Sequence, residues 1–83
     1  MNKVQRNCVA DHLSDILRKM ERLEERLYAA EENGNSEDVS RLSARIEKLS
    51  AELKGADSVL AMLGYVRHHH DDENGGHYTI EKI

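Results

Sequence analysis

The sequence predicts a mainly α-helical protein: an antiparallel two-helix coiled-coil hairpin, followed by a short C-terminal β-hairpin and dimerising into a four-helix bundle. Three observations predict it. Apolar residues recur in alternating steps of three and four through two long segments, the spacing of coiled-coil seams. A short break rich in Asn, Gly and Ser separates the segments. The end of the chain changes to Tyr, Val, Thr and Ile around a Gly-containing turn, which is typical of two paired strands. We therefore divide the chain into a helical hairpin, 1–63, and a tail, 64–83.

Each expected helix contains one continuous seam. The first helix covers about residues 3–32, and its seam consists of Val9, Leu13, Ile16, Met20, Leu23, Leu27 and Ala30. The second covers about residues 36–63, and its seam consists of Val39, Leu42, Ile46, Leu49, Leu53, Ala56, Leu60 and Leu63. Between them, Gly34 can end the first helix in the left-handed conformation, and Asn35 or Ser36 can cap the second. A linker of about three residues requires the helices to lie antiparallel.

The two seams meet in register when the helices are paired outward from Gly34, which sets Leu27 beside Leu42 and Ile16 beside Leu53. Two helices bury only one narrow stripe each, so the remaining apolar edge needs a cover. A chain of 83 residues is also marginal as a monomer. A homodimer is the simplest solution. The residues expected in its core and dimer seam are Leu13, Ile16, Met20, Leu23, Ile46, Leu49, Leu53 and Leu60.

The tail is expected to form strands near residues 65–70 and 77–82. A two-residue turn at Asn74 and Gly75 is a strong hairpin signal, but it sets the Arg67 side chain opposite another cation. A five-residue loop, 72–76, instead sets Arg67 opposite Glu81, and opposite charges across strands are favourable. We therefore favour the longer loop. In that register one face of the hairpin holds Val66, His68, His70, Tyr78 and Ile80.

The open end of the helical hairpin is the expected docking place for this face or for a partner. Val4, Cys8, Leu17, Val59, Met62 and Val66 add apolar surface there, outside the strict seams. Because two isolated strands are unstable in water, Tyr78 and Ile80 are expected to pack on this end, against Cys8, Val59 or Met62.

The stretch "RHHHDDENGGH" contains ligand types for zinc, nickel or copper. The candidate ligands are His68, His70, Asp71 and His77. Their spacing matches no established motif, and the single cysteine is far away in the sequence. We expect no metal and no cofactor. A pH-sensitive contact stays open, since histidine beside carboxylates titrates close to neutrality.

Composition excludes several classes of protein. The chain has 12 Lys and Arg against 16 Asp and Glu, with both signs spread through every segment, so direct nucleic-acid binding is not expected. Cys8 alone cannot form an intrachain disulfide, and there is no signal or membrane segment, so a cytoplasmic location is expected. The serines lie at expected caps or helix surfaces without a Gly-rich elbow or phosphate loop. We therefore expect no enzyme activity.

The tip of the helical hairpin is acidic. Glu31 and Glu32 oppose the helix dipole, and Glu37 and Asp38 follow the break. An acid-tipped antiparallel coiled coil resembles the arm of bacterial transcript-cleavage factors. That resemblance implies entry into a channel of RNA polymerase and a share in holding a metal ion. It covers about ten residues, and the family's second domain is missing from this sequence.

The expected function is that of a non-enzymatic protein–protein interaction module, a small adaptor, regulator or inhibitor that acts as a homodimer. The expected partner is another protein, and binding to a membrane is not expected. The residues expected to contact partners are Tyr65, Val66, Tyr78, Ile80, Glu31 and Glu32. The alternative is a metal- or pH-responsive regulator that uses the C-terminal histidines, and metal-assisted chemistry at the same histidines is the enzyme-class rival.

Overall fold

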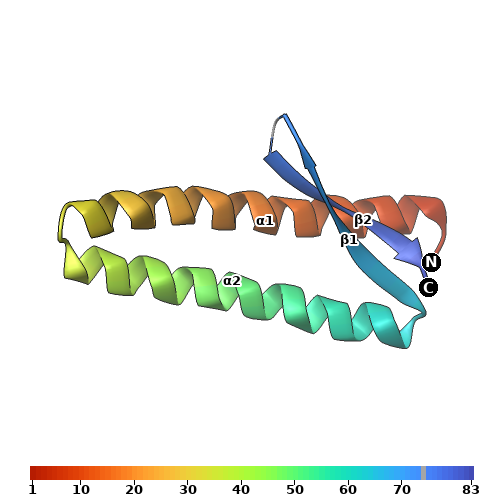
Figure 1. The fold of residues 1–83 in the computed structure, drawn as a ribbon. Coiled ribbons are helices and arrows are strands. Elements are labelled where there is room, and N and C mark those ends of the chain that lie inside the picture. The colour runs from red at the N-terminus through yellow and green to blue at the C-terminus, as the bar shows by residue number, and fades with distance from the viewer. Residues whose placement is uncertain (74) are drawn as a thin grey trace.

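Two long helices and one β-hairpin make up the computed structural model, which describes residues 1–73 and 75–83. Helix α1 spans Lys3–Glu32 and helix α2 spans Ser36–Met62, together about two thirds of the chain. Strand β1 (Tyr65–Asp72) pairs antiparallel with strand β2 (Gly75–Lys82). Figure 1 shows α1 and α2 side by side, joined at one end by a short linker. The predicted helical hairpin and the predicted C-terminal β-hairpin are confirmed.

Local sequence explains where each helix begins and ends. Asn2 caps α1 in a capping box, because its side chain accepts from the backbone N–H of Gln5 at 2.8 Å and the Gln5 side chain accepts from the Asn2 backbone. Asn35 caps α2 by accepting from a backbone N–H three residues further on. Gly34 follows α1 with a φ of 67°, and Gly64 follows α2 with a φ of 84°. Glycine adopts this left-handed conformation without steric cost, so both helices stop where the sequence predicts.

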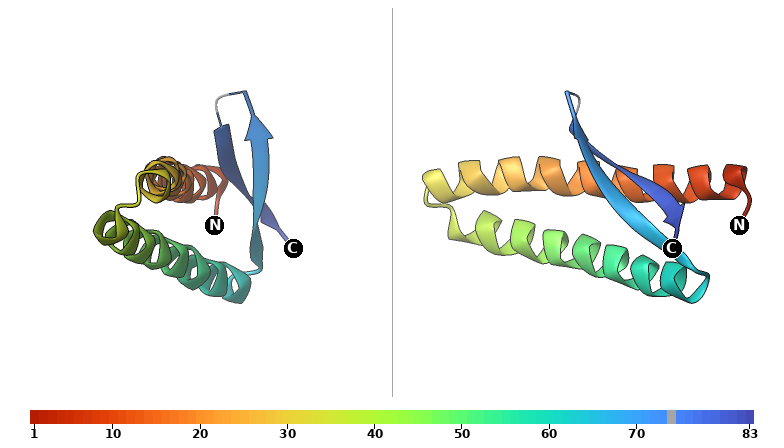
Figure 2. Two further views of the ribbon diagram at one scale, coloured as in Figure 1. Left: turned by 60° about the vertical axis from the view of Figure 1, so that its left-hand side comes forward. Right: turned by 45° about the vertical axis from the view of Figure 1, so that its right-hand side comes forward.

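The β-hairpin lies across one face of the helix pair. Two further views show it crossing α1 obliquely, with the end of β1 and the start of β2 projecting beyond that helix (Figure 2). The start of α1, the end of α2 and the C-terminus meet at the end of the molecule away from the 33–35 linker (Figure 1). We call this the open end, and the linker end the hinge end. The molecule measures 47 × 27 × 16 Å.

The core consists of two clusters along the helix pair. The open-end cluster buries Ala10, Leu13, Ile16, Leu53, Leu60, Tyr78 and Ile80, with Met20 and Leu49 partly buried against it. The hinge-end cluster buries Leu23, Ala30 and Leu42, with Leu27, Val39, Ile46 and Leu49 partly buried. All eight residues expected in the core and dimer seam, Leu13 to Leu60, belong to one of these clusters, so they make contacts within one chain. The hairpin covers part of the apolar edge for which the sequence suggested a second copy.

The strand register differs from the one expected. Arg67 pairs with Ile80, and Asp72 pairs with Gly75, so the predicted loop of five residues and the predicted Arg67–Glu81 pair are both wrong. Asn74, part of both turns considered, lies outside the described residues. A shift of one residue sends every β1 side chain to the other face. His68 and His70 accordingly lie on the outer face, and Arg67 lies on the face toward the helices.

The contacts of Arg67 explain this register. Its guanidinium donates to both carboxylate oxygens of Asp57 at 2.8 Å, and it lies 4.4 Å from the centroid of the Tyr78 ring. A hydrogen bond to a charged group contributes about 1.5–3 kcal/mol, and a cation–π contact about 0.5–1 kcal/mol. A cross-strand ion pair contributes at most about 1 kcal/mol. The anchor on α2 therefore outweighs the cross-strand pairing on which the sequence argument depended.

We expect the Asp57→Asn substitution to lower the free energy of unfolding by about 1–2 kcal/mol, because it removes the charge from a partly buried double hydrogen bond. Asp15→Asn is the matched control. Asp15 pairs with Arg18 across an exposed helical turn, and such pairs contribute at most about 1 kcal/mol. Urea unfolding of both variants checks this. Equal losses would show that the Arg67 anchor does not hold the hairpin.

A buried serine provides a second anchor for the hairpin. The Ser14 hydroxyl accepts from the Tyr78 backbone N–H at 2.9 Å and donates to the Ala10 carbonyl at 2.7 Å. Only 4% of Ser14 is exposed, so the expectation that the serines lie at caps or on helix surfaces is wrong for this residue. Each strand of a two-stranded sheet has backbone N–H groups that point away from the other strand, and the Ser14 hydroxyl provides the acceptor for that of Tyr78. This contact fixes the height of the hairpin along α1.

Candidate functional site

The histidine segment forms a polar network on the outer face of the hairpin. His70 and His77 are direct cross-strand partners, and their rings stack with centroids 5.1 Å apart. His70 Nε2 lies 2.9 Å from Thr79 Oγ1. Two further outer-face pairs are His68 Nε2 with Glu81 Oε2 at 3.0 Å and His77 Nδ1 with Asp72 Oδ2 at 3.1 Å. These contacts tie neighbouring side chains together along both strands.

The four candidate metal ligands do not share one face. His68, His70 and His77 are on the outer face, whereas Asp71 lies opposite Gly76 on the inner face. The Asp71 carboxylate contacts His69 Nε2 at 3.3 Å. Among the described residues, no group of three or more His, Cys, Asp or Glu side chains is arranged to hold a metal ion. The hairpin therefore presents paired polar side chains and no assembled ligand set.

The expected partner-binding residues fall into three environments. Tyr78 and Ile80 are buried in the open-end cluster, so they hold the hairpin on the helices. Tyr65 is half-buried, and its hydroxyl donates to the Met1 carbonyl oxygen at 3.0 Å. Val66 is exposed on the outer face. Glu31 and Glu32 are exposed at the hinge end, so the exposed members of the expected set lie at opposite ends of the molecule.

The open end carries most of the exposed apolar surface. Tyr78 and Ile80 lie in the open-end cluster, as expected, but Cys8, Val59 and Met62 are exposed and are not among the residues of that cluster. The hairpin instead packs further along the helices, on residues including Leu13, Ile16 and Leu53. Of the eight exposed large hydrophobic residues in the described chain, all but Tyr28 belong to the open end: Met1, Val4, Val59, Met62, Leu63, Val66 and Ile83.

Both termini are fixed to this end, which brings these residues together. The Ile83 backbone N–H donates to the Gly64 carbonyl at 3.0 Å, directly after α2. The contact of Met1 with the Tyr65 hydroxyl ties the N-terminus to the start of β1. Val59, Met62 and Leu63 occupy the last turn of α2 and its cap, with 57%, 87% and 58% of their surface exposed. The result is an apolar surface at one end of an otherwise highly charged chain.

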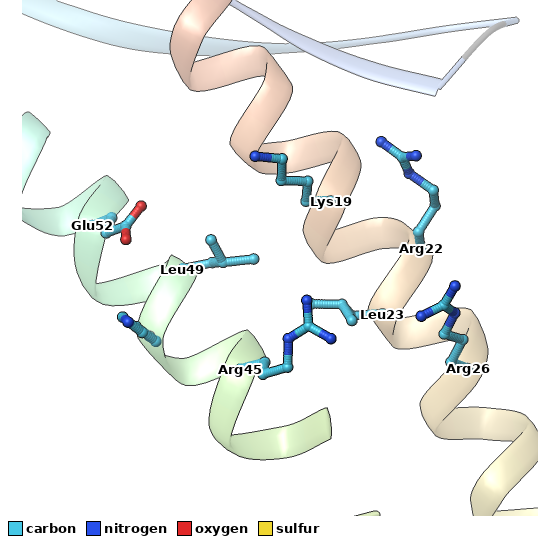
Figure 3. Close-up of a pocket in the computed structure, with 8 residues that line it drawn as sticks. Lys19, Arg22, Leu23, Arg26, Arg45, Leu49 and Glu52 are labelled. Atoms are coloured by element: carbon cyan, nitrogen blue, oxygen red, sulfur yellow. The ribbon is translucent and has the colours of Figure 1, made fainter. Parts of the chain in front are cut away.

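A basic groove runs between the two helices. Lys19, Arg22 and Arg26 line it from α1, Arg45 and Lys48 line it from α2, and its volume is about 450 Å³. Figure 3 shows Arg45 extending from α2 toward α1. The other lining residues are Leu23, Leu49 and Glu52. Leu23 is buried and Leu49 is half-buried, so the groove combines cationic walls with an apolar floor.

The groove is short of negative charge. Within the described part of the chain, none of its five cations forms an ion pair, and Glu52 is its one acidic lining residue. A neighbouring hollow of about 420 Å³ shares Arg26 and Arg45 and adds Arg41, which pairs with Asp38. Six of the twelve Lys and Arg side chains of the protein therefore line these two neighbouring hollows.

Sequence reasoning missed this groove because it counted charges along the chain. A signal was available: on each helix, the cations that line the two hollows are spaced by three and four residues, as are the seam residues. Once the helices are antiparallel, both rows border the same side of the seam. The groove also lies away from the hairpin. The Leu17 and Glu21 side chains are directed toward the hairpin, since a Cβ on Gly76 would lie 2.9 Å from Leu17 and 3.3 Å from Glu21. Lys19 is two residues from each, and two residues turn an α-helix by about 200°.

No protein-family model, curated protein or solved structure matches this chain. Its function must therefore be argued from its own residues.

The acidic tip contains two kinds of carboxylate. Asp38 accepts from Asn35 at 2.8 Å and from Arg41 at 2.7 Å, so it belongs to the α2 cap. Glu31, Glu32 and Glu37 are exposed.

Neither helix has an apolar stretch long enough to cross a lipid bilayer, within the described residues. Both helices carry charged side chains throughout, including the six cations of the groove region. The surfaces that distinguish this molecule are thus the apolar open end and the basic groove.

Proposed function

We propose that the protein is a non-enzymatic protein–protein interaction module, a small adaptor, regulator or inhibitor, that works as a homodimer joined at its open end. The observation that carries the proposal is the collection of seven exposed large hydrophobic residues at that end. Contiguous exposed apolar surface is rare on soluble monomers and marks interaction sites. A twofold interface places the same surface of both copies in contact, so one patch covers the other.

Charge favours the open end over the side of the helix pair. A four-helix bundle formed by two groove faces would bring five cations of one copy against five of the other. Like charges in contact disfavour that arrangement by several kcal/mol. The opposite side of the helix pair is partly covered by the hairpin. We therefore place the dimer where four helix ends meet, which leaves both basic grooves and both acidic tips accessible to a partner.

We expect the Val59→Lys, Met62→Lys double variant to be monomeric at concentrations where the parent protein sediments as a dimer. Both side chains are exposed in the monomer, so their replacement leaves the intrachain core intact. Two lysines per copy would place four cations in the twofold contact. Sedimentation equilibrium at micromolar concentrations measures the change.

Tyr28→Lys is the matched control. Tyr28 is the one exposed large hydrophobic residue outside the open end, with 71% of its surface exposed, among the described residues. This variant should keep the association constant of the parent protein. A monomeric parent protein, or an equal loss of association in both variants, would contradict the open-end interface.

A further inference from the structure

We propose that the basic groove binds an acidic amphipathic helix of a partner protein. This inference rests on the proposed function, because it names the chemistry of the partner that the interaction module takes. The bound helix would lie between α1 and α2, with its carboxylates against Lys19, Arg22, Arg26, Arg45 and Lys48 and its apolar side chains on the leucine floor.

The charge distribution of the molecule favours an acidic partner. The whole chain has a formal net charge of −4, yet the groove collects five cations and one acid. Grouping like charges raises the energy of the free protein through mutual repulsion, and a bound anionic group removes that repulsion. Because the remaining surface is acidic, the electrostatic field also steers an approaching anionic partner toward the groove.

The apolar floor of the groove favours a partner that also has apolar side chains. Leu23 is 5% exposed and belongs to the hinge-end cluster, and Leu49 is half-buried between the two clusters. A small anion has no apolar groups that could pack on these leucines. An amphipathic helix does, because it places an apolar stripe in a groove between helices while its polar flanks meet the rims.

The spacing of the cations favours a partner segment that is helical. Lys19, Arg22 and Arg26 follow one another at intervals of three and four residues along α1, as do Arg41, Arg45 and Lys48 along α2. From Lys19 to Arg26 the row is about 10 Å long, two helical turns. A third helix lying along the groove repeats its side chains at the same intervals, so its carboxylates match both rows.

The groove suits nucleic acid less well. None of its lining residues is aromatic, so it offers no stacking platform for unpaired bases. Duplex backbones are contacted by cations that stand out from a surface, and here the cations flank a depression with a leucine floor. The net negative charge of the rest of the chain also repels a long polyanion.

A synthetic peptide of about 18 residues tests the inference, long enough to form a helix when bound. Leucines at intervals of three and four form its apolar stripe, and glutamates flank that stripe. Its scrambled counterpart has the same composition without the helical period. Fluorescence anisotropy of the labelled peptides at low salt reports binding, and a duplex oligonucleotide serves as a third probe.

We expect the amphipathic peptide to bind the parent protein, and the Arg26→Glu, Arg45→Glu double variant to weaken that binding at least about tenfold, because charged rim residues of both helices are reversed. The matched control is the Arg18→Glu, Lys54→Glu double variant. It has the same net charge, and neither residue lines the groove. Its affinity for the peptide should stay within about twofold of the parent, and circular dichroism should show both variants folded.

Four outcomes would overturn the inference: no binding of the amphipathic peptide, equal binding of the scrambled peptide, equal loss in both double variants, or tighter groove-dependent binding of the duplex. Sedimentation of the same samples separates this inference from the proposed function. A dimer that does not bind the peptide contradicts the groove inference alone, whereas a monomer contradicts the open-end dimer whatever the peptide does.

Discussion

Replacing Tyr78 by alanine should lower the free energy of unfolding by about 3–5 kcal/mol, the usual loss when a buried large aromatic side chain is truncated. Tyr78 is 8% exposed in the cluster that joins the hairpin to the helices, and its ring also receives the Arg67 guanidinium. A domain of this size has only about 5–15 kcal/mol of stability. The variant should therefore lose much of its stability, beginning with the attachment of the hairpin.

His77→Ala is the control for Tyr78→Ala. His77 precedes Tyr78 on the same strand, and its side chain points to the outer face with 38% of its surface exposed. Its replacement should change the unfolding free energy by less than about 1 kcal/mol, since it removes no core contact. Urea unfolding, followed by circular dichroism, measures both. A Tyr78→Ala variant as stable as His77→Ala would mean that the hairpin is not part of the cooperative core.

Replacing Leu53 by alanine should cost about 2–5 kcal/mol, and replacing Leu49 by alanine should cost less. Both are seam residues on α2, but Leu53 is 5% exposed inside the open-end cluster, whereas Leu49 is only partly buried. The loss scales with the cavity left behind, and a partly buried site leaves a smaller one. Thermal and urea unfolding of the two variants compare them directly.

The two variants together also test whether a second copy covers the helix seam in solution. If a second helix pair packed over the seam, Leu49 would be as buried as Leu53, and the two substitutions would have equal effects. Equal and large losses would therefore support the bundle expected from the sequence. A loss under about 0.5 kcal/mol for Leu53→Ala would mean that the seam itself is misassigned.

The helical hairpin could be predicted because its signals are local and repeated. The alternation of three and four residues extends over several heptads in each helix, and Gly34 and Gly64 both mark helix ends with a positive φ. The antiparallel arrangement then follows from the three-residue linker. Each of these features depends on neighbouring residues, which a sequence displays directly.

The position of the hairpin could not be predicted in the same way, because it depends on contacts between distant residues. The Ser14 hydroxyl and the Asp57 carboxylate hold the backbone of Tyr78 and the side chain of Arg67, and nothing near either acceptor in the sequence identifies its partner. Reasoning from cross-strand charge alone chose a register one residue away. That error also placed His68 and His70 on the wrong face.

The candidate surfaces were predicted in part. The sequence identifies the extra apolar residues near the open end, but Val59 and Met62, two of those expected beneath the tail, are exposed. The groove was missed, although its cations have helical spacing in the sequence. Finding it requires the antiparallel pairing to be applied to the charged residues as well as to the seam.

The central claim, that two copies meet through their open ends, is tested most directly by distances between spin labels. Cys8 is the single native cysteine, is exposed, and lies near the open end. A second position, made by Glu32→Cys in a Cys8→Ser background, lies at the hinge end of α1. The two positions are 24 residues apart on one helix, a separation of about 36 Å.

Pulsed dipolar spectroscopy of each labelled dimer gives one distance per position. The open-end interface predicts a short distance between the labels at position 8 and a distance longer by tens of ångströms between those at position 32. Similar distances at both positions, a shorter distance at position 32, or no dipolar coupling at position 8 at concentrations above those needed for dimerisation would contradict it.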